Sequence, residues 1–117
     1  MIQRRRMGME HEEVVFSVEV LTGDNGRVVV IPRGELDMAT QGELRGALEV
    51  ARSSGDVVLD LSELRFLDTS GLRLILETTE ASRRKGFGFT VLRGSAAVQR
   101  LFDVAGVEEL VPFEEPT

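Results

Sequence analysis

One short stretch decides the fold of this chain: Leu64-Arg65-Phe66-Leu67-Asp68-Thr69-Ser70-Gly71-Leu72. It follows an apolar run at 57–61 that predicts a buried strand, and it precedes apolar residues at helical spacing over 72–79. The stretch therefore predicts a turn from a strand into a helix at the edge of a sheet. Two hydroxyl groups, those of Thr69 and Ser70, stand beside the Asp68 carboxylate at the predicted helix start.

Two interpretations of this turn are open. The first turn of a helix has unpaired backbone N–H groups and the positive end of the helix dipole, so a phosphoryl group on Thr69 or Ser70 would find hydrogen-bond donors. Asp, Thr and Ser are also the ordinary helix-capping residues, and most clusters of this kind are simply caps. No Glu or Gln stands where a capping box needs one, and Gly71 lowers helix propensity, which indicates close approach by another group.

The elements predicted around this turn alternate between strand and helix. In chain order they are strands at 14–21 and 27–31 joined by a glycine-rich turn, a helix with the apolar stripe Leu44, Ala47, Leu48 and Ala51, the strand at 57–61, a helix at 70–84, a strand at 87–92, a helix with the stripe Val98, Leu101, Phe102 and Ala105, and a short edge strand or extended tail at 110–113.

This order predicts an α/β fold with a mixed β-sheet: a leading antiparallel hairpin, then a βαβαβα succession, with helices packed on the sheet. Pro32 is expected to end the second strand or to lie at its rim, because proline donates no ladder hydrogen bond. Thr40 and Glu43 form a capping-box pattern for the first helix. We expect one domain at 14–113, a disordered tail at 1–13 and a short tail at 114–117.

Composition excludes several classes of protein. The chain has 117 residues and no cysteine, so it is one domain without disulfides or thiolate metal sites. A net charge of -6 argues against binding to nucleic acid, and the sequence has no apolar run that would insert into a membrane, so we expect a cytoplasmic protein. The single histidine, His11, lies in the predicted tail, which argues against a catalytic triad, and we expect no cofactor, no metal and no enzymatic activity.

Three motifs, in this order and at this spacing, resemble the STAS domain of bacterial anti-sigma factor antagonists over roughly residues 14–113: Gly34-Glu35-Leu36-Asp37, Leu59-Asp60-Leu61-Ser62 and Phe66-Leu67-Asp68-Thr69-Ser70-Gly71-Leu72. The resemblance implies a partner-switching protein with the STAS-like mixed sheet. Its unphosphorylated form would bind an anti-sigma factor that is also a serine/threonine kinase, and so free the sigma factor. Phosphorylation would inactivate it and a phosphatase would restore it.

The resemblance also implies site residues. Thr69 would be the phosphorylated residue, with Ser70 as the fallback. Partner contacts would be made by Asp37, Asp68, Ser70, Gly71, Leu72 and Arg73. Threonine stands where serine is usual, and Arg73 stands where a small residue is frequent, which suggests selection of a particular partner.

The sequence supports other functions to different degrees. Some relatives are cytoplasmic STAS subunits of membrane lipid transporters or parts of stress-sensing complexes, and the sequence leaves both open. Asp37, Asp60 and Asp68 are poorly placed for the acidic metal site of a phospho-accepting receiver domain, and for Asp60 we expect a bond to nearby backbone. A small-molecule or nucleotide sensor lacks a phosphate cradle in this sequence.

Overall fold

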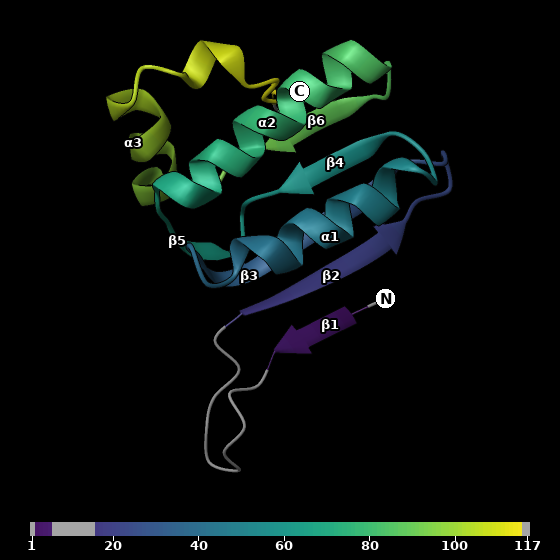
Figure 1. Cartoon of the computed structure of the whole chain (residues 1–117), viewed down its shortest axis with the longest axis horizontal. Helices are drawn as coiled ribbons and strands as arrows, with labels where there is room; N and C mark the ends of the chain where they lie inside the picture. The colour runs from purple at the N-terminus through teal and green to yellow at the C-terminus, as the bar shows by residue number, and fades with distance from the viewer. Residues whose placement is uncertain (1, 6–15, 116–117) are drawn as a thin grey trace.

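The computed structural model describes residues 2–5 and 16–115. Its strands and helices (Figure 1) are β1 (Ile2–Arg5), β2 (Phe16–Thr22), β3 (Val28–Leu36), α1 (Gln41–Arg52), β4 (Val57–Asp60), β5 (Leu64–Leu67), α2 (Thr69–Lys85), β6 (Phe89–Leu92), α3 (Ala96–Val104) and the short 3-10 helix η1 (Glu108–Leu110).

The strands form one mixed sheet in the order β1-β2-β3-β4-β6, with β5 beside β3. The pairs β1–β2 and β2–β3 are antiparallel, whereas β3–β4, β4–β6 and β3–β5 are parallel. This confirms the predicted fold class, in which an antiparallel hairpin leads into alternating strands and helices. The central position of β4 agrees with its first three residues, which are apolar and buried.

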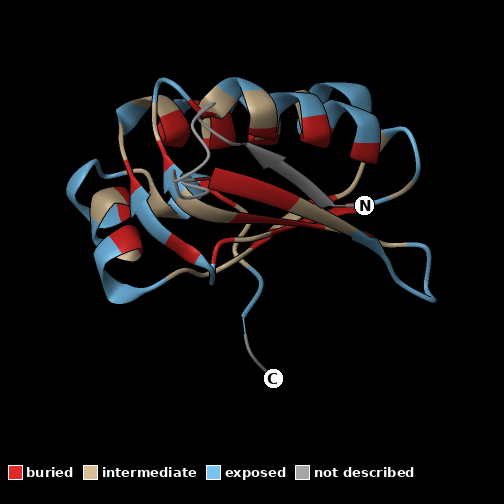
Figure 2. Cartoon of the chain, turned by 90° about the horizontal axis from the view of Figure 1, so that it is seen from below, coloured by how far each residue is buried: buried red, intermediate tan, exposed pale blue. Residues whose placement is uncertain are grey.

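α1 and α2 lie together on one face of the sheet, and the buried residues gather between them and the strands (Figures 1 and 2). Both helices have an apolar stripe at helical spacing, and the stripe predicted for α1 is buried along its whole length. In α2 the stripe is shifted, because Leu74 is buried and Leu76 only half-buried. α3 packs against β5 at the end of the sheet where α2 begins (Figure 1).

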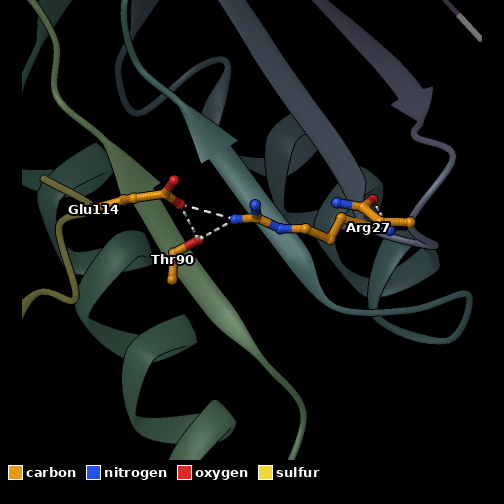
Figure 3. Close-up of polar contacts among 4 residues, drawn as sticks. Arg27, Thr90 and Glu114 are labelled. Carbon is orange, nitrogen blue, oxygen red and sulfur yellow. Dashed lines mark hydrogen bonds and ion pairs between the residues drawn. The ribbon is translucent and has the colours of Figure 1, made fainter. Parts of the chain in front are cut away.

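The opposite face of the sheet carries a polar connection (Figure 3). Arg27 Nη2 donates hydrogen bonds to Thr90 Oγ1 at 3.3 Å and to Glu114 Oε1 at 2.8 Å, and its side chain spans β4 to reach them. Thr90 alternates with the buried Phe89 and Val91, so it faces away from the helices. Phe113 forms a bridge to Val91 in β6, which confirms the end of the extended segment predicted at 110–113, whereas Leu110 belongs to η1.

Four details differ from the sequence-based expectations. The first difference is β1: Ile2–Arg5, expected to belong to a disordered tail, form a strand. Its antiparallel pairing covers the edge of β2, whose N–H and C=O groups would otherwise be unpaired. Residues 6–15, with His11, lie outside the described part of the chain. The second difference lies at the C-terminal end, where a short tail was expected at 114–117. Its first two residues, Glu114 and Glu115, are held by ion pairs to Arg27 and Arg93.

The third difference concerns Pro32, which lies inside β3 and pairs with Val18. The N–H of Val28 donates to the Asp56 carbonyl on the β4 side, and residues 30 and 32 face the same side by alternation. β4 pairs with β3 only at 28–30 and β5 only at 34–36. Pro32 therefore falls where β3 changes partner and no ladder hydrogen bond is needed.

The fourth difference is β5, which the sequence analysis did not predict. β4 does not lead directly into the turn, because Leu64–Leu67 first pair with β3 in parallel. Only the two outer residues of this short strand are buried, so its pattern lacks the alternation that identifies a strand in a sequence.

Candidate functional site

Two connections from strand to helix meet at one edge of the sheet. Leu36 at the end of β3 pairs with Leu67 at the end of β5, and the N–H of Asp68 donates to the Leu36 carbonyl at 3.1 Å. The loop from β3 to α1, with Asp37, and the start of α2, at Asp68, therefore lie side by side. Asp37 and Asp68, which the resemblance assigns to one set of partner contacts, are thus neighbours in the structure.

Asp68 is the N-cap of α2. Its Oδ1 accepts hydrogen bonds from the N–H groups of Ser70 and Gly71, at 2.9 and 3.1 Å, and from the Ser70 hydroxyl at 2.6 Å. Burial acts to raise the pKa of Asp68, but these bonds and one from the Met38 N–H outweigh it, so the pKa lies below its ordinary value. The carboxylate is therefore a fixed negative charge.

The two hydroxyls of the turn differ in availability. Thr69, the first residue of α2, is exposed, and its side chain makes no hydrogen bond in the described structure. Ser70 is half-buried and its hydroxyl is donated to Asp68. The Thr69 hydroxyl can therefore enter the active site of a modifying enzyme more easily than the Ser70 hydroxyl.

Gly71 and Leu72 face the interior. A Cβ on Gly71 would lie 2.5 Å from Leu67 Cδ1 and 2.8 Å from Leu36 Cγ, which confirms that another group approaches the backbone closely here. Leu72 is only 6% exposed and belongs to the core. The resemblance implies that both residues contact a partner, but their burial gives them a packing role beneath the surface.

The surface beside Thr69 comes from the loop before α1 and from α2. Asp37 is half-buried and its Oδ1 accepts the N–H groups of Ala39 and Thr40, at 3.0 and 3.1 Å. Met38 is 79% exposed. Arg73 is exposed and makes no ion pair in the described structure. Sequence reasoning missed Met38, although an apolar residue in a polar loop was a usable signal.

An apolar groove adjoins the turn, between β5 and α3. It has a volume of about 340 Å³, and its walls include Phe66, Leu67, Leu101 and Val104, with Arg65 and Arg100 beside them. Phe66 and Val104 are among the most exposed large apolar residues of the described chain. The sequence alone does not predict this groove, since it does not predict β5.

Three further expectations concern groups outside the turn. Asp60 Oδ1 accepts the N–H of Ser62 at 2.9 Å, which confirms the predicted bond to nearby backbone. Within residues 2–5 and 16–115, no cluster of three or more acidic, histidine or cysteine side chains is arranged to hold a metal ion. No helix among the described residues is long and apolar enough to cross a membrane.

Comparison with known proteins points in one direction. A family model described as "Mlab, STAS domain" matches residues 20–112. Anti-sigma-B factor antagonists of Staphylococcus epidermidis and Staphylococcus aureus are 32% and 30% identical to the chain over 104 residues, which are 87% of this chain and 95% of each relative.

Solved structures agree with this. An anti-sigma factor antagonist from Mycobacterium paratuberculosis has a TM-score of 0.75 at 28% identity, covering 86% of each chain. The anti-sigma factor antagonist SpoIIAA in its unphosphorylated form has a TM-score of 0.68 at 20% identity, covering 86% of this chain and 88% of its own, and supports the fold alone.

Proposed function

This chain belongs to the family of STAS-domain anti-sigma factor antagonists, and we propose that its unphosphorylated form binds an anti-sigma factor serine/threonine kinase and is released by phosphorylation of Thr69. Members of this family are regulatory proteins rather than enzymes. In this function the chain frees a sigma factor by occupying the kinase, and a phosphatase returns the phosphorylated chain to the active pool.

The observation that carries the proposal is the state of Thr69. It is exposed at the first position of α2, and no hydrogen bond of its side chain has to break before it reacts. Ser70 would have to give up its 2.6 Å bond to Asp68 and leave a half-buried position. Thr69 is therefore the favoured acceptor, with Ser70 as the fallback.

The surface proposed to contact the kinase surrounds Thr69. It contains the predicted contact residues Asp37, Asp68, Ser70 and Arg73, together with the exposed Met38. Gly71 and Leu72 hold this surface from beneath, since both are buried. The groove between β5 and α3 continues the same surface, because Leu67 in its wall directly precedes Asp68.

The switch is electrostatic. Phosphorylation adds a charge of roughly -1.5 to -2 at neutral pH. In the free chain this charge stays in water, but in a complex it would be desolvated beside the Asp68 carboxylate, whose pKa is already low. Because the added charge costs much more in the complex than in the free chain, the chain dissociates while its fold is kept.

Incubation with the anti-sigma kinase and ATP, followed by peptide mass mapping, tests the proposal. The expected result is one phosphate on Thr69 of the wild type and none on the Thr69→Ala variant. Thr22 is also exposed but lies at the hairpin end of β2, so it serves as the internal control and should stay unmodified. A phosphate on Ser70 alone, or on neither residue, contradicts the assignment.

A second candidate function is a STAS subunit of a membrane lipid transporter, or of a stress-sensing complex. The observation in its favour is that the description of the matching family model, "Mlab, STAS domain", names no sigma factor, so the match at 20–112 fits STAS proteins of other functions as well. Purified chain offered separately to the anti-sigma kinase and to the cytoplasmic subunits of the transporter decides between them. Binding to the transporter subunits alone would reject sigma-factor regulation.

A further inference from the structure

A phosphate on Thr69 would find most of the hydrogen-bond donors of the helix start already occupied. The N–H groups of Ser70 and Gly71 already donate to Asp68 Oδ1, at 2.9 and 3.1 Å. The N–H of Leu72 makes the first helical bond, to the Asp68 carbonyl at 2.9 Å. Most of the donors expected at this helix start are therefore occupied, and the ionised Asp68 carboxylate repels the phosphate as well.

Arg73 stands where such a phosphate needs a cation. Residues four apart in a helix share one face, with Cβ atoms about 5–6 Å apart, and a long side chain leans toward the helix N-terminus. Thr69 and Arg73 have this spacing in α2, and both are exposed. Arginine also matches the geometry of phosphate oxygens through two parallel N–H donors.

Arg73 is also uncommitted. The carboxylate at the equivalent spacing on its other side is Glu77, and Glu77 is paired with Arg45 of α1 at 2.9 Å. No ion pair or hydrogen bond of the Arg73 side chain occurs in the described structure. Its guanidinium is therefore available to a new anion on the same helix face.

We propose that Arg73 binds the phosphoryl group of phosphorylated Thr69 through an ion pair within α2. This proposal rests on the proposed function and deepens it, because it names what stabilises the inactive state. In the unphosphorylated state Arg73 is free to contact the kinase, and in the phosphorylated state it is withdrawn into the ion pair. The phosphate thus removes one partner contact in addition to its own charge.

Other charges face this region and enter the test. Asp68 caps the same helix, Asp37 lies on the neighbouring loop, and Arg65 of β5 lies in the wall of the adjoining groove. Asp68 and Asp37 disfavour the doubly charged phosphate equally in every arginine variant, so they do not contribute to differences in phosphate pKa between these variants. Arg65 is the competing cation and has its own variant below.

The test installs phosphothreonine at position 69 by an expanded genetic code and follows the phosphate by phosphorus NMR from about pH 5 to about pH 8, around its second pKa near 6. A nearby cation favours the doubly charged form. Arg73→Gln should therefore raise the second pKa of the phosphate by about 0.3 pH units, the size expected of a helical ion pair. Arg73→Lys should retain most of the wild-type value.

Two matched variants act as controls. Arg65→Gln removes the competing cation, and Arg83→Gln removes a charge from the far end of α2, roughly 20 Å away. Both should leave the phosphate pKa at the wild-type value. High salt, about 1 M, should remove most of the difference between the wild type and Arg73→Gln.

An unchanged pKa in Arg73→Gln overturns the proposal, and so does a shift that appears only in Arg65→Gln. The outcome is independent of any kinase, since the phosphate is built in during synthesis. A failure of kinase labelling at Thr69 would contradict the proposed function and leave this result standing.

Discussion

The starts of α1 and α2 use the same residue types in different ways. The turn before each helix contains an aspartate whose Oδ1 accepts two backbone N–H groups: Asp37 from Ala39 and Thr40, and the N-cap Asp68 from Ser70 and Gly71. Each has a threonine within three residues of that aspartate. The two turns are also neighbours, joined by the hydrogen bond from the Asp68 N–H to the Leu36 carbonyl.

The difference lies in the threonine hydroxyl. Thr40 is only 6% exposed, and its Oγ1 donates to the Glu35 carbonyl at 2.8 Å and accepts the Asp37 N–H at 2.9 Å. Thr69 is exposed and its hydroxyl is unbound in the described structure. At α1 the threonine fixes the loop, whereas at α2 the aspartate alone does so. A hydroxyl that the fold does not need is available for regulation.

The largest expected effect is on binding. Phosphorylated Thr69 should bind the anti-sigma kinase at least about 100-fold more weakly than the unmodified chain, because an uncompensated buried charge costs several kcal/mol. Thr69→Glu should weaken binding less, and Thr69→Ala should bind normally and stay active. Isothermal calorimetry measures all three. Thr22→Glu, at the other end of the sheet, is the matched control, and equal affinities for wild type and phosphorylated chain would contradict the switch.

The next largest effect concerns the packing that joins the two turns. Gly71→Ala should destabilise the fold by about 1–3 kcal/mol, because its Cβ would lie 2.8 Å from Leu36 Cγ, which is not a free side-chain end. Gly46→Ala in α1 is the control, since a Cβ there meets nothing within 4 Å, and it should stabilise by about 0.4–1 kcal/mol. Urea unfolding measures both. Equal stabilities of the two variants would show that the side chains of Leu36 and Leu67 move aside without cost and would contradict this prediction.

The comparison of the two threonines can be broken directly. Thr40→Val should lower the free energy of unfolding by about 1–3 kcal/mol, because it removes the buried hydroxyl that bonds the Asp37 N–H and the Glu35 carbonyl. Thr69→Val should change it by less than about 0.5 kcal/mol, as for most exposed positions. Thermal unfolding of the matched pair is the measurement. Losses of similar size would mean that both hydroxyls are structural.

The turn at α2 could be predicted from the sequence more completely than the turn at α1. The order of residues from Asp68 to Leu72 correctly predicted the helix start, and the glycine correctly indicated close packing. At α1 the pattern of Thr40 and Glu43 predicted a capping box, but the Thr40 side chain makes no cap hydrogen bond to the helix. Its hydroxyl is bound instead by Glu35 and Asp37, a contact set by the path of β3 that no local rule contains.

The parts that could not be predicted depend on partners distant in the sequence. β5 exists as a strand through its pairing with β3, about 30 residues earlier in the chain, and β1 exists through the free edge of β2. The groove beside the turn needs both β5 and α3 to be placed. For the same reason the burial of Leu72 and the occupation of the helix donors by Asp68 became visible only in three dimensions.

The smallest expected effect concerns the charge of Asp68, which caps α2 without any hydrogen bond from the Thr69 hydroxyl. The folded-state pKa of Asp68 is lowered, although burial acts to raise it, because hydrogen bonds from the Ser70 hydroxyl and from backbone N–H groups favour the charged form. As pH falls, the unfolded chain therefore binds this proton first, and the stabilisation present above pH about 4 is lost as pH drops through the folded pKa. Asp68→Asn keeps a capping oxygen and loses only the charge, so it should cost about 0.3–1 kcal/mol at neutral pH and nothing at low pH.

Ser70→Ala removes one hydrogen-bond donor to Asp68, so the loss of stability seen in the wild type should move toward higher pH. Urea unfolding of the three proteins across the acid range is the measurement, and parallel pH profiles for the wild type and Asp68→Asn would contradict the assignment.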